Sequence, residues 1–215
     1  MPLYKTITVD SKAKILIWKL EEDLNELKDN LTLSQTCIER LGILKSELHQ
    51  RQFLSIRHLL TAAGYSNEDL YYDHQGKPHL KGENYISVSH SFDFSGIIIS
   101  SQPAGIDIEK QREKIIRVAN KFTPLDEYKT LANDEAIIRK LTIVWGVKEA
   151  VYKIMNEPGM SFLNHIYVRD FNFEDLETSA EVNYRNRNIL FHANFLEFEG
   201  FTCVYALSSD SDIEQ

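Results

Sequence analysis

The chain of 215 residues is long enough for one large domain or two smaller lobes, and either arrangement can bury a core. Its net charge of −8 argues against nucleic-acid binding, and no apolar run approaches the roughly 18 residues of a membrane helix. Cys37 and Cys203 lie far apart and the first residues lack a signal-peptide pattern, so we expect a cytoplasmic protein that does not bind membranes.

The first hundred residues combine helical and strand patterns. A polar, exposed helix is predicted at 21–30. Helical spacing of apolar residues predicts a second helix at about 34–63, with Gly64 as its end. Strands are predicted at 14–19, 85–89 and 96–100.

The second half repeats this mixture after a break at 102–105. Helices are predicted at 113–121 and 135–155. The expected strands are 106–109, 166–168, 181–184, 189–195 and 202–207. We therefore predict an α+β fold with two similar lobes, the N-terminal one covering 1–100 and the C-terminal one covering 101–215.

Two acidic residues lie two positions apart in the strand expected at 106–109. Successive strand side chains alternate between faces, so Asp107 and Glu109 should point to the same side. Neighbouring carboxylates repel each other unless a cation lies between them, and oxygen ligands of this kind suit Mg²⁺. The alternative is an exposed strand face with two solvated acids, and the pattern alone leaves that alternative open.

Glu149 and Lys153 lie four residues apart on the helix expected at 135–155, so they share one helix face. One interpretation is a surface ion pair, which contributes roughly 0.2–0.5 kcal/mol. The other makes Glu149 a third metal ligand or a general base, and makes Lys153 a contact for a phosphate group. Helical spacing by itself does not separate these interpretations.

Residues that can bind phosphate occur near the strands of the first lobe. His90 lies at the end of the strand at 85–89, and Lys77 lies on a turn stiffened by Pro78. A histidine or lysine in such a place can donate to a phosphate, although each can equally be an ordinary surface residue. The chain has neither a GxxxxGK[ST] loop nor a GxGxxG motif, so the common nucleotide-binding folds are not indicated.

Five short motifs follow one another along the chain. They are GKP at 76–78, SVSHS at 87–91, GIDIEK at 105–110, FTPLDEY at 122–128 and WGVKEAVYK at 145–153. Together with Arg51 upstream, this series resembles the 4′-phosphopantetheinyl transferases, and more narrowly their longer, surfactin-synthetase-activating type. Each motif alone is weak evidence for the family. The probability that all of them occur by chance in the family's order is small, because the individual probabilities multiply.

The resemblance implies transfer of the phosphopantetheine arm of coenzyme A to a serine of an acyl or peptidyl carrier protein, releasing adenosine 3′,5′-bisphosphate. Asp107, Glu109 and Glu149 would hold Mg²⁺. Glu149 would also help to deprotonate the serine, and Lys153 would assist catalysis at the phosphates. The coenzyme A-binding residues that the resemblance implies are Arg51, Lys77, Pro78, Ser89, His90 and Lys153.

The resemblance also implies how the chain is assembled. Longer members of this family resemble two fused copies of a smaller subunit, so we expect a monomer with pseudo-twofold lobes and the active site between them. Two other functions stay open from the residues: a non-catalytic coenzyme A-binding module that regulates a synthase, and a Mg²⁺-dependent phosphohydrolase.

Basic residues are concentrated just after the strand that carries Asp107 and Glu109. They are Lys110, Arg112, Lys114, Arg117 and Lys121. Because carrier proteins are typically acidic, this segment is a candidate docking edge for the carrier. The alternative is a solvated helix face.

Overall fold

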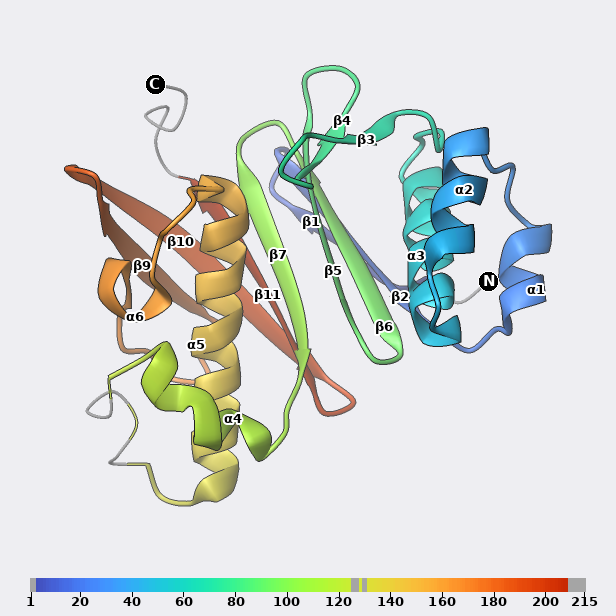
Figure 1. Cartoon of the computed structure of the whole chain (residues 1–215). Helices are drawn as coiled ribbons and strands as arrows, with labels where there is room; N and C mark the ends of the chain where they lie inside the picture. The colour runs from blue at the N-terminus through green and yellow to red at the C-terminus, as the bar shows by residue number, and fades with distance from the viewer. Residues whose placement is uncertain (1–2, 125–127, 129–130, 209–215) are drawn as a thin grey trace. The chain divides into compact units, whose positions relative to one another are not determined.

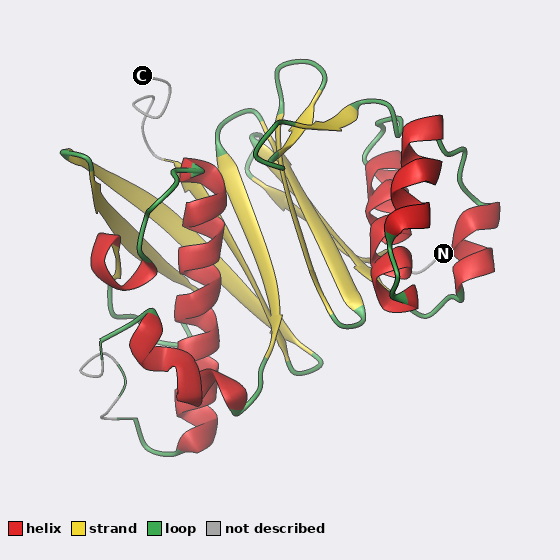
Figure 2. Ribbon diagram, in the orientation of Figure 1, coloured by secondary structure: helices red, strands yellow, loops and turns green. Residues whose placement is uncertain are grey.

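The computed structural model describes residues 3–124, 128 and 131–208, and of the FTPLDEY segment residues 125–127 lie outside this range. The chain divides into two compact units, Met1–Ser101 and Gln102–Gln215. Both units combine helices with antiparallel sheets, which confirms the predicted α+β class (Figures 1 and 2). Among the helices of the described residues, none is long and apolar enough to cross a membrane.

The first unit is built on an antiparallel sheet of four strands. In spatial order these are β1 (Leu3–Val9), β2 (Ala13–Lys19), β6 (Phe94–Ser100) and β5 (Tyr85–Ser91). A separate pair is formed by β3 (Leu70–Tyr72) and β4 (Pro78–Leu80). Strand β1 is mostly exposed, so it lacks the apolar run that made β2 and β6 recognisable, and the sequence patterns missed it.

Three helices accompany this sheet: α1 (Leu24–Asp29), α2 (Gln35–Ile43) and α3 (Glu47–Ala62). The prediction of one helix over about 34–63 was wrong, because Leu44 takes an extended conformation and α3 begins anew after Ser46. The predicted end was correct, since α3 stops just before Gly64, whose φ is +91°. Helix α3 packs on β2 and β6, and its apolar residues fill the core of this unit.

The second unit is an antiparallel sheet of five strands covered by a long helix. In spatial order the strands are β7 (Ala104–Lys110), β11 (Phe201–Ser208), β10 (Arg187–Phe198), β9 (Glu177–Tyr184) and β8 (Ile166–Val168). The helical segments are α4 (Lys114–Val118), the 3₁₀ turn η1 (Ala119–Lys121), α5 (Asp134–Met155) and α6 (Phe162–His165). The predicted helix at 113–121 is therefore two short pieces.

Helix α5 lies across the sheet, packed mainly on β7 and β11 (Figure 1). Two glycines allow this close approach. A Cβ added to Gly105 of β7 would lie 1.9 Å from the carbonyl oxygen of Ala150, and one added to Gly146 of α5 would lie 2.6 Å from Cγ2 of Val204. Real Cβ atoms do not approach other atoms this closely, so small residues at both places set the helix-to-sheet distance. The C-terminal half of α5 is thereby held directly on β7.

Candidate active site

Strand β7 directs two carboxylates towards helix α5. Asp107 pairs across the ladder with Val204, and Glu109 pairs with Thr202, so both acids lie on one face as their spacing predicted. A Cβ on Gly146 would lie 3.9 Å from Oδ2 of Asp107, which places that carboxylate under the helix. The Asp107 side chain is only 9% exposed and that of Glu109 is 27% exposed. An exposed strand face with two solvated acids is therefore not what the chain forms.

Lys153 contacts Asp107 across the helix–strand interface. Its Nζ donates to Oδ1 of Asp107 at 2.8 Å and to the carbonyl oxygen of Ile106 at 2.7 Å. The surface pair of Glu149 with Lys153, considered from the helical spacing, is thus replaced by a pair between α5 and β7. Because Asp107 is almost fully buried, this ion pair also compensates the burial of its charge.

Glu149 completes the acidic group. Burial raises the pKa of its carboxyl to about 7, and repulsion from Asp107 and Glu109 adds to this effect, while the positive charge of Lys153 opposes it. A carboxyl with a pKa near neutrality can accept or release a proton under physiological conditions. Strongly shifted pKa values of this kind are concentrated at functional sites, because burial and like charges are costly elsewhere.

The raised pKa of Glu149 predicts that stability without metal depends on pH. The folded value of about 7 exceeds the ordinary value of 4.5, so the folded state binds this proton more tightly. The resulting stabilisation is present below pH 4.5 and is lost as pH rises through 7. Allowing for solvent screening, we expect the unfolding free energy to fall by about 2 kcal/mol over this window.

Urea unfolding in EDTA, followed from pH 5 to pH 8, measures this dependence. Glu149→Gln removes the titrating group and should flatten that part of the profile, so that the variant is the more stable protein at pH 8. Equal pH profiles for the two proteins would contradict the assignment of the proton to Glu149.

The donor chemistry of this acidic group suits a hard cation such as Mg²⁺, which prefers carboxylate oxygens. Its present arrangement is not a formed metal site. Over the described parts of the chain, no three His, Cys, Asp or Glu side chains are grouped so that they could hold a metal ion. Instead Asp107 is paired with Lys153, and Oε1 of Glu109 accepts a hydrogen bond from Arg112 at 3.1 Å. Cationic side chains thus pair with two of the three carboxylates that were predicted to bind metal, Asp107 and Glu109.

A small cavity of about 190 Å³ adjoins Glu109. Its walls come from the end of β7, from α4 and from α5, and its lining residues are Glu109, Lys110, Arg112, Lys114, Ile115, Val118 and Trp145. The cavity therefore has apolar walls with basic side chains beside them, and one of the predicted metal ligands forms part of its edge.

The predicted coenzyme A-binding residues of the first unit come from three elements. Arg51 on α3 donates from Nη2 to the carbonyl oxygen of Leu20 at 3.1 Å, and its buried Nε has no hydrogen-bond partner within the described residues. Lys77 precedes β4, and burial lowers its pKa while the charge of Asp73 opposes that shift. Pro78 is the first residue of β4.

Ser89 and His90 are neighbours on β5. Ser89 is buried opposite Gly96, whereas His90 is exposed. Adjacent strand residues point to opposite faces, so the chain does not bring these two side chains together on one surface of the sheet. Their shared assignment to coenzyme A stays a prediction.

Lys148 was overlooked, although it lies inside the WGVKEAVYK motif. Its side chain is fully buried and donates to two backbone carbonyl oxygens. The sequence carried one signal for this: Lys148 lies between Trp145 and Tyr152 at helical spacings of three and four, which places it on an aromatic stripe. A lysine is seldom buried without partners, and those partners are distant in sequence.

Comparison with known proteins agrees with these features. Residues 103–206 match the family model of the 4′-phosphopantetheinyl transferase superfamily. This segment covers nearly all of the second unit's described residues, so the second unit is similar to the members of that superfamily.

One similar relative is the 4′-phosphopantetheinyl transferase gsp of Aneurinibacillus migulanus, which is 25% identical over 158 residues. The match covers 71% of this chain and 64% of the relative, so the chain spans less than two thirds of that protein's length.

Proposed function

We propose that this protein transfers the 4′-phosphopantetheine arm of coenzyme A to a serine hydroxyl of an acyl or peptidyl carrier protein. Adenosine 3′,5′-bisphosphate would be released. The observation that supports this proposal most strongly is that Asp107 and Glu109 share one face of β7, where Lys153 of α5 pairs with Asp107, in the unit that matches the superfamily. A serine hydroxyl is a weak nucleophile until a nearby base takes its proton.

In this proposal Glu149 is the base that accepts the serine proton. In the metal-free protein its pKa of about 7 makes the carboxylate a stronger base than an ordinary glutamate. Asp107, Glu109 and Glu149 would hold Mg²⁺, which neutralises pyrophosphate charge when bound. Lys153 already lies among these acids and would contact a phosphate oxygen through its ammonium group.

Arg51, Lys77, Pro78, Ser89 and His90 would bind coenzyme A from the first unit. Arg51 supports this proposal because its buried Nε is a donor that still lacks an acceptor within the described residues. Lys77 supports it because a partly buried ammonium group forms a stronger charge-assisted bond with phosphate than an exposed one does. The exposed His90 can also donate to a phosphate group.

Intact-mass spectrometry of a purified apo-carrier protein tests the proposed function. After incubation with this protein, coenzyme A and Mg²⁺, the carrier should gain the mass of one phosphopantetheine group. EDTA should abolish the gain. If several carrier types gain no mass while coenzyme A binds, the chain is a non-catalytic binding module; if coenzyme A is merely cleaved, it is a hydrolase.

The carrier is proposed to dock beside the cavity next to Glu109. Apolar walls with flanking basic side chains fit an acidic partner that also presents apolar groups. Arg112 is unsuited to a test because it donates to Glu109 and its loss would disturb the carboxylates. Lys114 and Arg117 are exposed on α4 and avoid this problem.

Charge reversal at Lys114 and Arg117 to glutamate should raise the KM for the carrier by roughly tenfold, since rim charges chiefly steer association. The KM for coenzyme A should not change. Lys12→Glu, a reversal of an exposed lysine in the first unit, is the matched control and should leave both constants unaltered. An unchanged carrier KM in the double variant would remove α4 from the docking surface.

A further inference from the structure

Lys148 is a buried lysine one residue before Glu149 on α5. Its side chain is among the largest that are fully buried, with 1% of the residue exposed. Its Nζ donates to the carbonyl oxygen of Phe122 at 2.5 Å and to that of Phe162 at 2.9 Å. At this depth the ammonium group cannot reach a substrate, but it does bind two backbone segments.

The two carbonyl acceptors belong to segments 40 residues apart in the chain, at Phe122 and Phe162. Phe122 directly follows η1 and therefore ends the α4–η1 segment, whereas Phe162 is the first residue of α6. A single ammonium group thus ties both segments to the same side of α5. A buried ammonium with carbonyl acceptors is costly to remove, because the carbonyl oxygens would lose their donor.

Aromatic rings surround this anchor. The centroid of the Trp145 ring lies 5.1 Å from the ring centroid of Phe122 and 5.3 Å from that of Phe162. The ring centroids of Tyr152 and Phe162 are 5.5 Å apart. Aromatic packing holds the side chains of the two segments, but rings alone set the backbone direction only loosely. The hydrogen bonds from Lys148 add directional contacts to the backbone itself.

The α4–η1 segment in turn forms one wall of the cavity beside Glu109, through Ile115 and Val118. We propose that Lys148 is a positioning residue: by holding Phe122 and Phe162 on α5, it sets the α4 wall of this cavity, where the carrier protein docks. The inference rests on the proposed function, because it assigns the cavity to the carrier. The WGVKEAVYK motif would then have two roles: Glu149 acts as the base, and Lys148 positions the docking surface.

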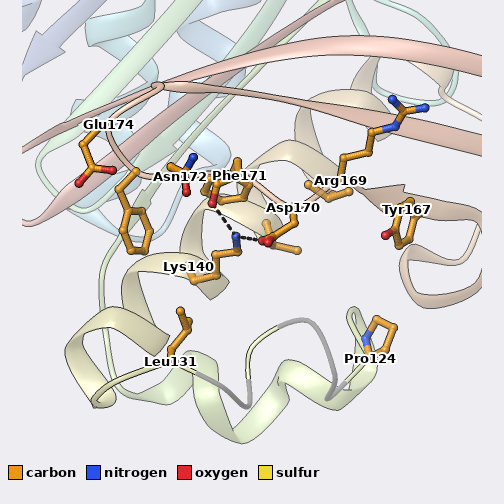
Figure 3. A pocket seen from close by; sticks show the side chains of 12 residues that line it. Pro124, Leu131, Lys140, Tyr167, Arg169, Asp170, Phe171, Asn172 and Glu174 are labelled. Carbon is orange, nitrogen blue, oxygen red and sulfur yellow. Dashed lines mark hydrogen bonds and ion pairs between the residues drawn. The ribbon is translucent and has the colours of Figure 1, made fainter.

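Another buried lysine of α5 gives a matched control. Nζ of Lys140 donates to Oδ1 of Asp170 at 2.6 Å and to the carbonyl oxygen of Phe171 at 3.1 Å (Figure 3). It lines a separate cavity of about 720 Å³ that none of the predicted site residues borders. Lys140→Met therefore also removes a buried ammonium from α5 and frees a backbone carbonyl, but that carbonyl belongs to Phe171, in the loop after β8, and to neither of the segments that Lys148 binds.

The test compares Lys148→Met, Lys148→Arg and Lys140→Met by hydrogen exchange and by steady-state transfer. Exchange is followed at the amide of Thr123, which donates to Ala119, and at that of His165, which donates to Ser161. Lys148→Met should lose protection at both amides and raise the carrier KM on the order of tenfold, with kcat and the KM for coenzyme A nearly unchanged. Lys148→Arg keeps the charge and should restore part of both effects, and Lys140→Met should show neither.

Unchanged protection at Thr123 and His165 in Lys148→Met would overturn the anchoring. Lost protection with an unchanged carrier KM, or an equal KM rise in Lys140→Met, would overturn the positioning role. Lys148→Gln, which is uncharged but still a donor, replaces the methionine variant if that variant does not fold, and the same outcomes apply. A wild-type protein that modifies no carrier refutes the proposed function instead, and the exchange data still decide whether Lys148 anchors the two segments.

Discussion

Glu149→Gln should lower kcat for phosphopantetheine transfer by about 10²–10⁴-fold, the usual contribution of a general base. The amide keeps the shape of the side chain but cannot accept the serine proton. It also removes a negative charge from the group formed with Asp107 and Glu109, so Mg²⁺ should bind less tightly. Carrier mass analysis under single-turnover conditions, with saturating coenzyme A and Mg²⁺, separates the loss of the base from weaker metal binding.

Glu135→Gln is the control for this experiment. Glu135 lies on the same helix but is exposed in its first turn, so its replacement should leave kcat unchanged. Wild-type kcat in Glu149→Gln at saturating Mg²⁺ would exclude Glu149 as the base. Another group would then have to accept the serine proton. The raised pKa of Glu149 would in that case affect only the pH dependence of stability.

Gly105→Ala should destabilise the second unit by roughly 3 kcal/mol or more, at the upper end of the cost of overpacking. The added Cβ would lie 1.9 Å from the carbonyl oxygen of Ala150, which is backbone and cannot turn aside. Helix α5 would have to move away from β7, and Glu149 and Lys153 would move with it. We therefore expect a lower urea midpoint together with a lower kcat.

Gly42→Ala is the matched control for the substitution at Gly105. Gly42 is in α2, and apart from its chain neighbours and the backbone of its own helix, no atom of the described residues lies within 4 Å of a Cβ placed there. The same chemical change should there stabilise the protein by about 0.5–1 kcal/mol, because alanine favours the helix. If Gly105→Ala were as stable as the wild type, the close approach of α5 to β7 would not set the geometry of the acidic group.

The sequence patterns predicted the elements of the second unit well, because most of them are long or strongly apolar. The helix expected at 135–155 is α5, and the strand expected at 166–168 is β8. The predictions failed for elements whose position or bounds depend on tertiary packing and not on a local pattern. Strand β1 is an exposed strand without an apolar run, and the break between α2 and α3 lies in a stretch whose apolar residues keep helical spacing.

The sequence by itself determined the α+β class and the common face of Asp107 and Glu109, because side-chain alternation is a property of any strand. Only the tertiary structure decided that Lys153 pairs with Asp107 instead of Glu149, since Gly105 lets α5 lie close enough to β7 for that contact. It also decided that Lys148 is buried and that the pKa of Glu149 rises to about 7. Both follow from removal of charged groups from water, and that depends on which distant segments cover them.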